Sequence, residues 1–333
     1  MVGALLAATT GVVGASVVTM TVIALPSMLK RGYAPSLASG TIAASGTLGQ
    51  IIPPSIILIL LGDVIGVPVG ELFIGAVVPG IMLILAYILY IVYVAWRHPH
   101  LAPAVRDDNP ELAALWISVL KSLLPPLLLI IAVLGSIFYG IASPTESAAV
   151  GALGSLILAA LHRRLTLPNL RDAMEKTARL TSMVFLIFIG ATAFGLVFVG
   201  MGGDGLILDI FSGLPGGKWT FLVLSMLLIF ILGFFLDFIE ICFIVVPIIA
   251  PVAIHLNIDP LWFALLIAIN LQTSFLTPPF GFSLFYLKAS APPTLKLMDI
   301  YRGIMPFVGI QIIVLALLIS FPAISLWLPN LMG

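Results

Sequence analysis

The chain has 333 residues, of which 61% are hydrophobic and 8% are charged, and its mean hydropathy is +1.25. A soluble domain carries about a quarter charged residues, so lipid must surround most of this chain, which excludes a secreted domain and a cytosolic enzyme. The net charge of zero leaves no basic face for nucleic acid, and the single Cys242 excludes a disulfide framework.

Apolar segments long enough to cross a bilayer follow one another along the chain. One crossing takes about 20 apolar residues, and the polar breaks predict crossings at residues 37–66, 72–96, 118–140, 144–161, 179–200, 260–290 and 303–329. Stretches 1–29 and 219–256 are too long for one crossing and are interrupted at Gly14-Ala15-Ser16 and at Asp237. We expect each to form a re-entrant hairpin, whose two half-helices enter and leave on the same side.

The basic residues test this topology. If Lys30 and Arg31 face the inside, thirteen of the 14 basic residues lie on that side and only Lys218 lies outside. The positive-inside rule requires such an asymmetry. Tryptophans near predicted helix ends would form an aromatic belt at Trp96, Trp116, Trp219, Trp262 and Trp327. The sequence therefore predicts an all-α, multi-pass membrane protein whose C-terminus lies outside.

Two parts of the chain share one plan. Residues 14–62 and 236–287 each run from a hairpin tip through a proline and a turn to a helix that contains small polar residues and a Pro-Pro pair. By the predicted topology one hairpin opens inside and the other outside, so the repeat is inverted. Interrupted helices at matching places in two halves are the best sequence indication of a transport site.

The chemistry of such a site follows from its backbone. A Pro-Pro pair removes two amide donors and frees carbonyls one turn earlier, and these carbonyls are suitable ligands for a desolvated cation such as sodium. Half-helix N-termini direct partial positive charge at an anionic substrate group. Hydroxyl oxygens stand at the same interruptions, on Thr47, Ser55, Thr273, Ser274 and Thr277.

These motifs resemble a known family, the large (M, DctM-like) membrane subunit of tripartite ATP-independent periplasmic (TRAP) transporters. The resemblance covers essentially the whole chain. It rests on residues 14–19, 25–33, 44–55, 140–149, 235–237 and 276–281, which include Pro144-Thr145-Glu146 and both Pro-Pro pairs. It implies an inverted-repeat, elevator-type fold, similar to the ion-transporter superfamily, with two re-entrant hairpins and two broken helices.

The resemblance also implies a function. It predicts a sodium-driven importer of organic acids in the bacterial inner membrane, with no cofactor beyond sodium as coupling ion. The partners would be a small DctQ-like membrane subunit and a periplasmic DctP-like binding protein that delivers substrate. Sodium would bind at Ser16, Thr19, Thr47, Gly49, Asp237, Thr273, Ser274 and Thr277. Substrate would bind at Ser16, Ser55, Asp237, Thr277, Pro53, Pro54, Pro278 and Pro279.

The plan divides the chain into four parts. Residues 1–70 and 219–291 would each hold a hairpin and a broken helix of the transport domain. Residues 71–218 would be scaffold and connecting helices, with cytoplasmic loops at 97–117 and 162–178, and 292–333 would be the last transmembrane helix. Family members usually carry further scaffold helices ahead of the first hairpin, so the chain resembles a truncated gene, a late-assigned start or a fragment.

Several alternatives stay open. A single-component sodium/anion symporter with the same hairpins, a channel or a non-functional truncated permease would share these patterns. An intramembrane aspartyl protease needs two facing aspartates, and only Asp237 lies deep in the predicted bilayer. Asp237 serves either cation handling or helix capping, with Glu240 as a weaker candidate for the same role. Glu146 serves either in helix capping or in docking or gating.

Overall fold

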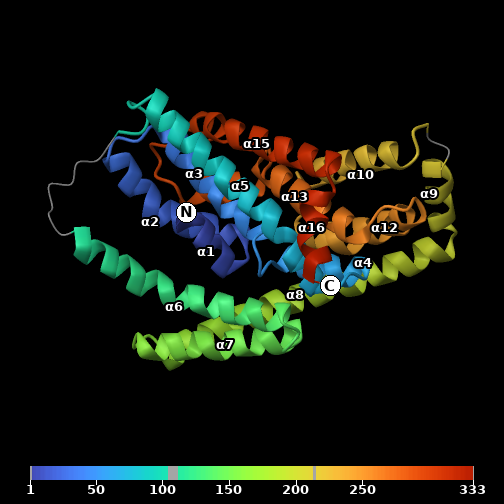
Figure 1. The fold of residues 1–333 in the computed structure, drawn as a ribbon, viewed down its shortest axis with the longest axis horizontal. Helices are drawn as coiled ribbons and strands as arrows, with labels where there is room; N and C mark the ends of the chain where they lie inside the picture. Colours follow the sequence, from blue (N-terminus) through green and yellow to red (C-terminus); the bar gives the residue numbers. More distant parts are fainter. Residues whose placement is uncertain (1, 104–111, 213–214, 333) are drawn as a thin grey trace. The chain divides into compact units, whose positions relative to one another are not determined.

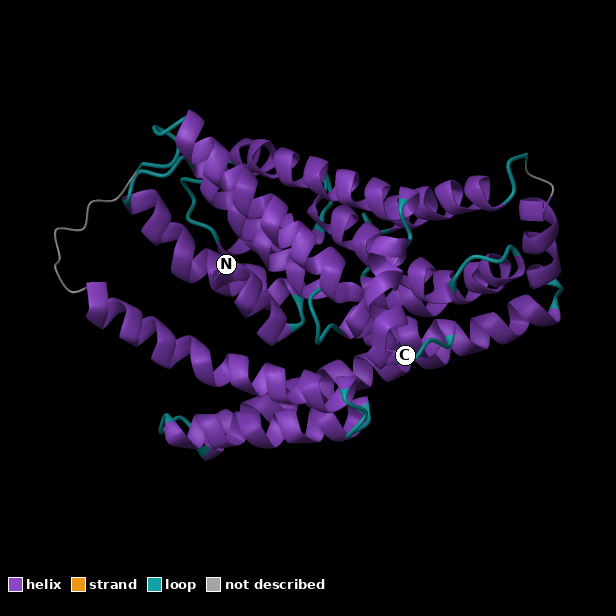
Figure 2. Cartoon of the chain, in the orientation of Figure 1, coloured by secondary structure: helices purple, strands orange, loops and turns teal. Residues whose placement is uncertain are grey.

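The computed structural model describes residues 2–103, 112–212 and 215–332, and all regular structure in these ranges is helical (Figures 1 and 2). The chain divides into two compact units. One unit joins Met1–Val105 to Ala191–Gly333, and the other is Arg106–Gly190. The predicted Arg106 and part of the predicted loop at 97–117 lie outside the described residues. The side chains of Trp116 and Lys121 also lie outside them.

The first unit starts with a pair of helices, a broken helix and a long helix. Their bounds are Val2–Thr10 (α1), Val13–Lys30 (α2), Pro35–Thr47 (α3), the 3-10 turn Leu48–Gln50 (η1), Ile56–Ile65 (α4) and Val69–Arg97 (α5). Pro35 stands at the first turn of α3, where its missing N–H costs nothing. Gly66 ends α4 with φ +80°, a left-handed conformation that glycine adopts without steric cost. We call α1 and α2 the first hairpin and residues 51–55 the first break.

The rest of this unit lies in the C-terminal part of the chain. Its helices are Gly203–Ser212 (α9), Lys218–Leu232 (α10), Phe238–Glu240 (α11), the π-helix Ile241–Val245 (η2), Val246–His255 (α12), Pro260–Leu276 (α13), Phe282–Ser290 (α14), Leu297–Ser320 (α15) and Ala323–Met332 (α16). Pro247 has no N–H for the preceding turn, and the backbone just before it winds as a π-helix. We call α10 to α12 the second hairpin and residues 277–281 the second break.

Helix α13 is the centre of the first unit. Every residue from Leu261 to Leu276 is buried, because α3, α4, α5, α10 and α15 all pack against it. Two buried hydrogen bonds fix its position. The Trp262 indole N–H donates to the Leu318 carbonyl at 2.9 Å, and the Asn270 amide donates to the Met226 carbonyl at 2.6 Å. Trp262 is therefore a core residue with 6% exposure, and its predicted place in an aromatic belt is wrong.

The second unit contains Leu112–Phe138 (α6), Pro144–Leu161 (α7) and the start of Leu167–Gly200 (α8). A capping box begins α7. The Ser143 N–H donates to the Glu146 carboxylate at 2.8 Å, and the Glu146 N–H donates to the Ser143 hydroxyl at 3.3 Å. This reciprocal pair satisfies two N–H groups that a helix start leaves unpaired. The capping interpretation of Glu146 is therefore confirmed.

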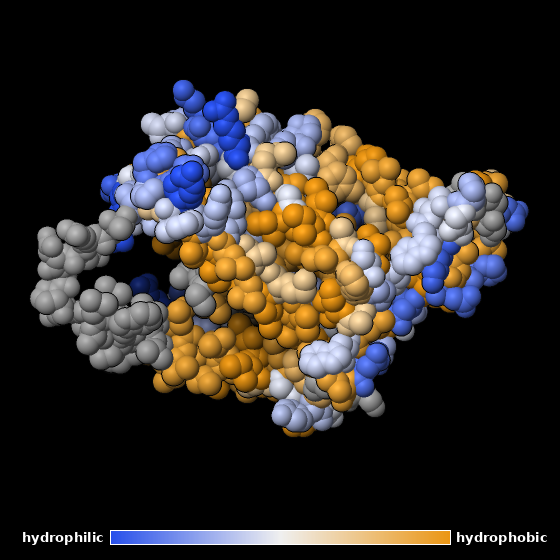
Figure 3. All heavy atoms as spheres, turned by 45° about the horizontal axis from the view of Figure 1, so that its top comes forward, coloured by the Kyte–Doolittle hydropathy of each residue, from blue (hydrophilic) through white to orange (hydrophobic). Residues whose placement is uncertain are grey.

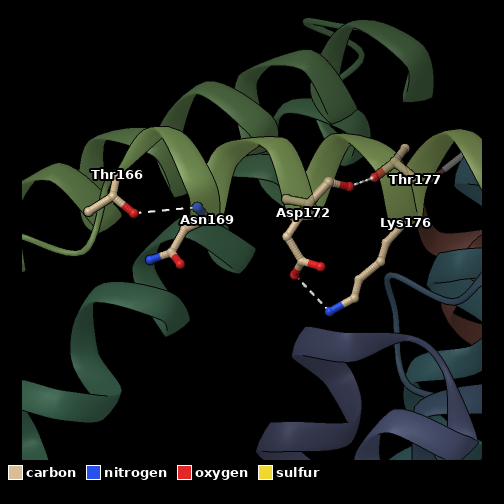
Figure 4. A network of polar contacts seen from close by, with 6 residues as sticks. Thr166, Asn169, Asp172, Lys176 and Thr177 are labelled. Atoms are coloured by element: carbon tan, nitrogen blue, oxygen red, sulfur yellow. Dashed lines mark hydrogen bonds and ion pairs between the residues drawn. The ribbon is translucent and has the colours of Figure 1, made fainter.

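Helix α8 begins twelve residues before the predicted crossing at 179–200. Its first turns are polar: Arg171 pairs with Glu175 at 2.8 Å and Lys176 with Asp172 at 2.7 Å, each four residues apart. Figure 4 shows the second pair, with the Thr166 hydroxyl accepting from the Asn169 N–H. Such i,i+4 pairs support a helix in water. The predicted polar loop at 162–178 is thus largely the hydrophilic start of α8.

Six helices of the described chain are long and apolar enough to cross a membrane: α2, α5, α7, α8, α11–α12 taken together, and α15. Figure 3 shows apolar side chains over most of the visible face, with hydrophilic ones in smaller patches. On α5, exposed Ile81, Leu85 and Leu89 recur every four residues, as lipid-facing residues on one side of a helix do. The chain is a multi-pass membrane protein.

One predicted crossing is divided in the structure. The crossing predicted at 303–329 is two helices, since Pro322 follows Phe321 between α15 and α16 and cannot continue a helix. The elevator arrangement, the inverted repeat and the four-part division remain predictions.

Candidate functional site

The tip of the first hairpin lies at Gly11-Val12, between α1 and α2. Gly11 has φ +62°, which lets the chain reverse. Ser16 is fully buried, donates to the Val12 carbonyl at 3.0 Å and shares a hydrogen bond with the Thr10 hydroxyl across the tip. The predicted interruption at Gly14-Ala15-Ser16 was therefore placed too late, because those residues form the first turn of α2.

The first break lies beside this tip. A Cβ on Gly49 would overlap the Ala7 carbonyl of α1, and a Cβ on Gly11 would lie 3.8 Å from the Pro54 carbonyl oxygen. Only glycine at position 49 lets the two backbones approach so closely. The break itself holds a cis bond between Pro53 and Pro54. Pro53 and Pro54 lie between the end of η1 and the start of α4, where the sequence predicts the interruption.

Hydroxyl groups at the first break donate to backbone carbonyls. Thr47 donates to the Ala44 carbonyl at 2.9 Å, and Ser55 donates to the Gln50 carbonyl at 2.5 Å while accepting from the Leu58 N–H at 3.4 Å. Donation leaves acceptor capacity on each hydroxyl oxygen. Thr47 and Ser55 are both fully buried, so these oxygens can serve a ligand that reaches the break.

The second break has the same chemistry. Thr273, Ser274 and Thr277 donate to carbonyls three or four residues earlier, at 2.8, 2.8 and 2.7 Å. A second cis Pro-Pro bond joins Pro278 to Pro279. After it, Ser283 donates across the break to the Phe275 carbonyl at 2.7 Å. This bond and the Ser55 bond at the first break each tie a half-helix start to the end of the preceding helix.

The second tip, Gly233–Asp237, lies against the second break. A Cβ on Gly233 would overlap the Ser274 hydroxyl, and the rings of Phe235 and Phe280 have centroids 5.5 Å apart. Asp237 is the N-cap of α11 and accepts from the Phe238 N–H at 2.8 Å. It is partly buried, and the Glu240 carboxylate lies within electrostatic range of it. Two carboxylates at one tip favour a cation there.

The predicted sodium residues form two groups, one at each tip and break. Ser16, Thr47 and Gly49 belong to the first tip and break, and Asp237, Thr273, Ser274 and Thr277 to the second. Thr19 is half-buried on α2, and no hydrogen bond in the described structure joins it to the first group. Of the predicted substrate residues, Pro53, Pro54 and Ser55 lie at the first break, and Pro278 and Pro279 at the second.

The two groups are connected because each hairpin packs on the half-helix that follows the other hairpin's break. The first hairpin packs through α2 on α14, the half-helix that follows the second break. The second hairpin packs through α11, η2 and α12 on α4, the half-helix that follows the first break. Each hairpin thus contacts the half-helix that follows the other hairpin's break, and a change at one group has a structural path to the other.

Comparison with known proteins identifies this architecture. Residues 1–324 match the family described as "Tripartite ATP-independent periplasmic transporter, DctM component". A Pseudomonas aeruginosa C4-dicarboxylate TRAP transporter large permease protein is 32% identical over 330 residues, 99% of this chain and 76% of that protein. The chain belongs to the DctM family of TRAP transporters. It is a TRAP large permease subunit, and the resemblance seen in the sequence is confirmed.

Other relatives of this permease carry different substrates in their names. A Vibrio cholerae sialic acid TRAP transporter large permease protein is 30% identical over 92% of this chain and 70% of its own length. A Halomonas elongata ectoine TRAP transporter large permease protein is 30% identical over 98% of this chain and 75% of its own length. Identity is nearly the same for all three relatives, so it does not select among their substrates.

Sequence reasoning missed several polar residues of the permease core. Gln50, Gln272 and Gln311 are buried, and in the described structure their amides have no hydrogen bond of regular geometry. Tyr87 of α5 lies within interaction range of Gln272 and Gln311. A glutamine in an apolar helix could have been recognised in the sequence as a buried polar residue. Tyr87 could not, because only the packing of α5 on α13 and α15 brings it near those amides.

Proposed function

We propose that this chain is the transport-bearing subunit of a sodium-driven TRAP importer of organic acids in the bacterial inner membrane. The observation that carries the proposal is the meeting of two hairpin tips with two Pro-Pro breaks, where hydroxyl oxygens and two carboxylates gather. A small membrane subunit and a periplasmic binding protein, both implied by the family, complete the transporter.

The proposed sodium ligands form two sites. Ser16, Thr47 and Gly49, with Thr19 at the edge, serve the first. Asp237, Thr273, Ser274 and Thr277 serve the second, where the carboxylate makes cation binding stronger. Sodium takes oxygen ligands, and these residues offer hydroxyl, carbonyl and carboxylate oxygens that hydrocarbon would otherwise leave poorly solvated.

The proposed substrate site lies between the breaks. Ser16, Ser55, Asp237 and Thr277 would offer hydrogen bonds, and Pro53, Pro54, Pro278 and Pro279 would shape the backbone around the ligand. The half-helices α4 and α14 begin directly after the breaks, and a helix N-terminus favours an anionic group. Sodium and these N-termini together would hold a carboxylate, and the loaded domain would then move across the membrane in an elevator-type step.

The test is reconstitution with the small subunit and candidate binding proteins, followed by uptake under a sodium gradient. The panel contains C4-dicarboxylates, sialic acid, isethionate and ectoine, the substrates in the names of relatives. We expect saturable uptake that needs both sodium and a binding protein. Uptake that persists without any binding protein would favour the single-component symporter, and flux that needs neither would contradict the proposal.

Asp237→Asn tests the second sodium site. Asparagine keeps the helix cap but removes the charge, so we expect half-maximal uptake to need about tenfold more sodium, the effect of about 1.4 kcal/mol in binding. Asp259→Asn is the matched control, because Asp259 is also an N-cap, accepting from the Trp262 N–H at 2.9 Å at the start of α13. If both variants need the same sodium concentration for half-maximal uptake, Asp237 is not a ligand of the second sodium site.

A further inference from the structure

Tyr286 of α14 contacts the first hairpin. A Cβ on Gly14 would lie 3.0, 3.1 and 3.2 Å from three atoms of the Tyr286 ring, the closest being Cζ, which carries the hydroxyl. The hydroxyl end of the ring therefore rests on the first turn of α2, two residues before Ser16. Apart from the residues next to Gly14 and the nearby backbone of α2, the three nearest described atoms all belong to Tyr286.

The second tip lies beside the segment that carries Tyr286. The Phe235 ring of that tip and the Phe280 ring have centroids 5.5 Å apart, and Phe280 precedes Tyr286 by six residues. Tyr286 belongs to α14, directly after the second break, and α14 packs on α2. The charge of Asp237 also acts on Tyr286. Tyr286 thus touches the first tip region from a helix that directly follows the break in contact with the second tip.

Packing alone does not explain a tyrosine at this position. The equivalent residue of the first broken helix, seven residues after its Pro-Pro pair, is Leu61, which is 0% exposed. Tyr286, seven residues after Pro279, is 42% exposed. Tyr286 therefore places a hydroxyl group, which can donate and accept a hydrogen bond, where the first half has a buried aliphatic side chain.

We propose that Tyr286 is a positioning residue that couples closure of the two hairpin tips. This inference rests on the proposed sodium sites. Sodium at Asp237 changes the field on the Tyr286 hydroxyl, and the ring, which rests on Gly14, transmits that change to the first tip. Tyr286 is not itself a sodium ligand, so its loss uncouples the tips and leaves sodium binding in place.

The experiment follows the first tip with a thiol probe. Ala15→Cys, in a Cys242→Ala background, places a thiol at an exposed position beside Gly14. The protein is purified with its partner subunits in lipid nanodiscs, and sodium chloride replaces choline chloride at constant ionic strength. Two quantities are measured at each sodium concentration: the rate of reaction with a charged maleimide and the thermal stability.

We expect sodium to slow labelling in this parent protein. Tyr286→Ala should label at one rate whatever the sodium concentration, and Tyr286→Phe, which keeps the ring, should need about 5-fold or more sodium for the same protection. Both variants should still gain thermal stability from sodium. Phe285→Ala is the control, since Phe285 is the neighbouring residue of α14 and is 58% exposed; it should behave as the parent.

The outcomes separate this inference from the proposed function. If sodium neither stabilises the parent nor slows its labelling, the sodium sites themselves are wrong. If the parent responds and both Tyr286 variants match Phe285→Ala, only the coupling role is overturned. If Tyr286→Phe loses the sodium-dependent gain in stability, Tyr286 is a ligand rather than a positioning residue, and the proposal also fails.

Discussion

Polar side chains at the second tip and break form hydrogen bonds with the backbone. Thr277 donates to the Thr273 carbonyl, and Asp237 caps α11. Substituting either residue therefore changes local structure as well as any ligand set. An informative series of variants must therefore separate the hydrogen bond to the backbone from the proposed role as a sodium ligand.

Thr277 allows such a series. Thr277→Ser keeps the hydroxyl, and Thr277→Val keeps the shape and removes it. We expect Thr277→Ser to retain the thermal stabilisation that sodium gives, and Thr277→Val to lose most of it. The comparison of sodium with choline in a thermal unfolding assay checks this. Thr220→Val is the control, because Thr220 donates to the Pro215 carbonyl at an exposed site outside both groups.

The capping box of α7 predicts a purely structural effect. Ser143→Ala removes the hydroxyl that accepts from the Glu146 N–H, so it should lower stability by about 1 kcal/mol, measured as a lower Tm. Sodium dependence should not change. Ser155→Ala, in the exposed middle of the same helix, should leave the Tm nearly unaltered. A larger loss for Ser155→Ala would contradict the capping argument.

Residues whose role comes from local chemistry were predictable, and those placed by packing were not. The sequence identifies Asp237, the Pro-Pro pairs and the Glu146 cap, because each acts on its own helix. It does not identify Tyr286, which meets Gly14 only through packing of α14 on α2. Trp262 shows the same limit, since its position near a helix end indicated a belt and its bond to Leu318 places it in the core.

At the scale of elements, α3 and α15 approach each other closely. A Cβ on Gly40 would overlap the Gly303 carbonyl, and a Cβ on Gly303 would overlap the Ser36 carbonyl. Helices in lipid associate through such small residues, which let backbones approach. The last long helix is thereby held against the helix that leads into the first break.

This contact makes a sharp prediction. Gly303→Ala should force α3 and α15 apart and lower stability by about 1–3 kcal/mol, the usual effect of overpacking. Gly309→Ala is the matched control on α15, because a Cβ there would meet nothing within 4 Å. The Tm of each purified variant checks the difference. Equal losses would mean that helix propensity, rather than the contact with α3, decides stability.

Hydropathy and the positions of the prolines predicted most boundaries between helices. The 3-10 turn, the start of α8 and the split between α15 and α16 were missed. Hydropathy does not reveal the start of α8, because its first turns carry i,i+4 ion pairs and a solvated helix can have the same composition as a loop. The tip of the first hairpin was misplaced because Gly11 and Gly14 look alike in the sequence. Only one of them takes a positive φ, and the other makes room for a ring.

At the scale of the whole molecule, the sidedness of the basic residues is testable. In a Cys242→Ala background, His100→Cys should react with a membrane-impermeant thiol reagent only after cells are opened. Pro215→Cys, at an exposed position near Lys218, should react in intact cells. These opposite results follow if the basic residues face the cytoplasm. The reverse pattern would invert the topology, and with it the side on which each hairpin opens.

The packing of each hairpin on the half-helix that follows the other break also constrains biosynthesis. The first hairpin is synthesised long before α14, on which it packs. The half-helix α4 likewise precedes α12, on which it packs. These early segments cannot reach their final packing alone, so they must remain in the bilayer, inserted but incompletely packed, until α12 and α14 have been synthesised. Folding of this permease therefore cannot proceed half by half, because the first half reaches its final packing only once the second has been made.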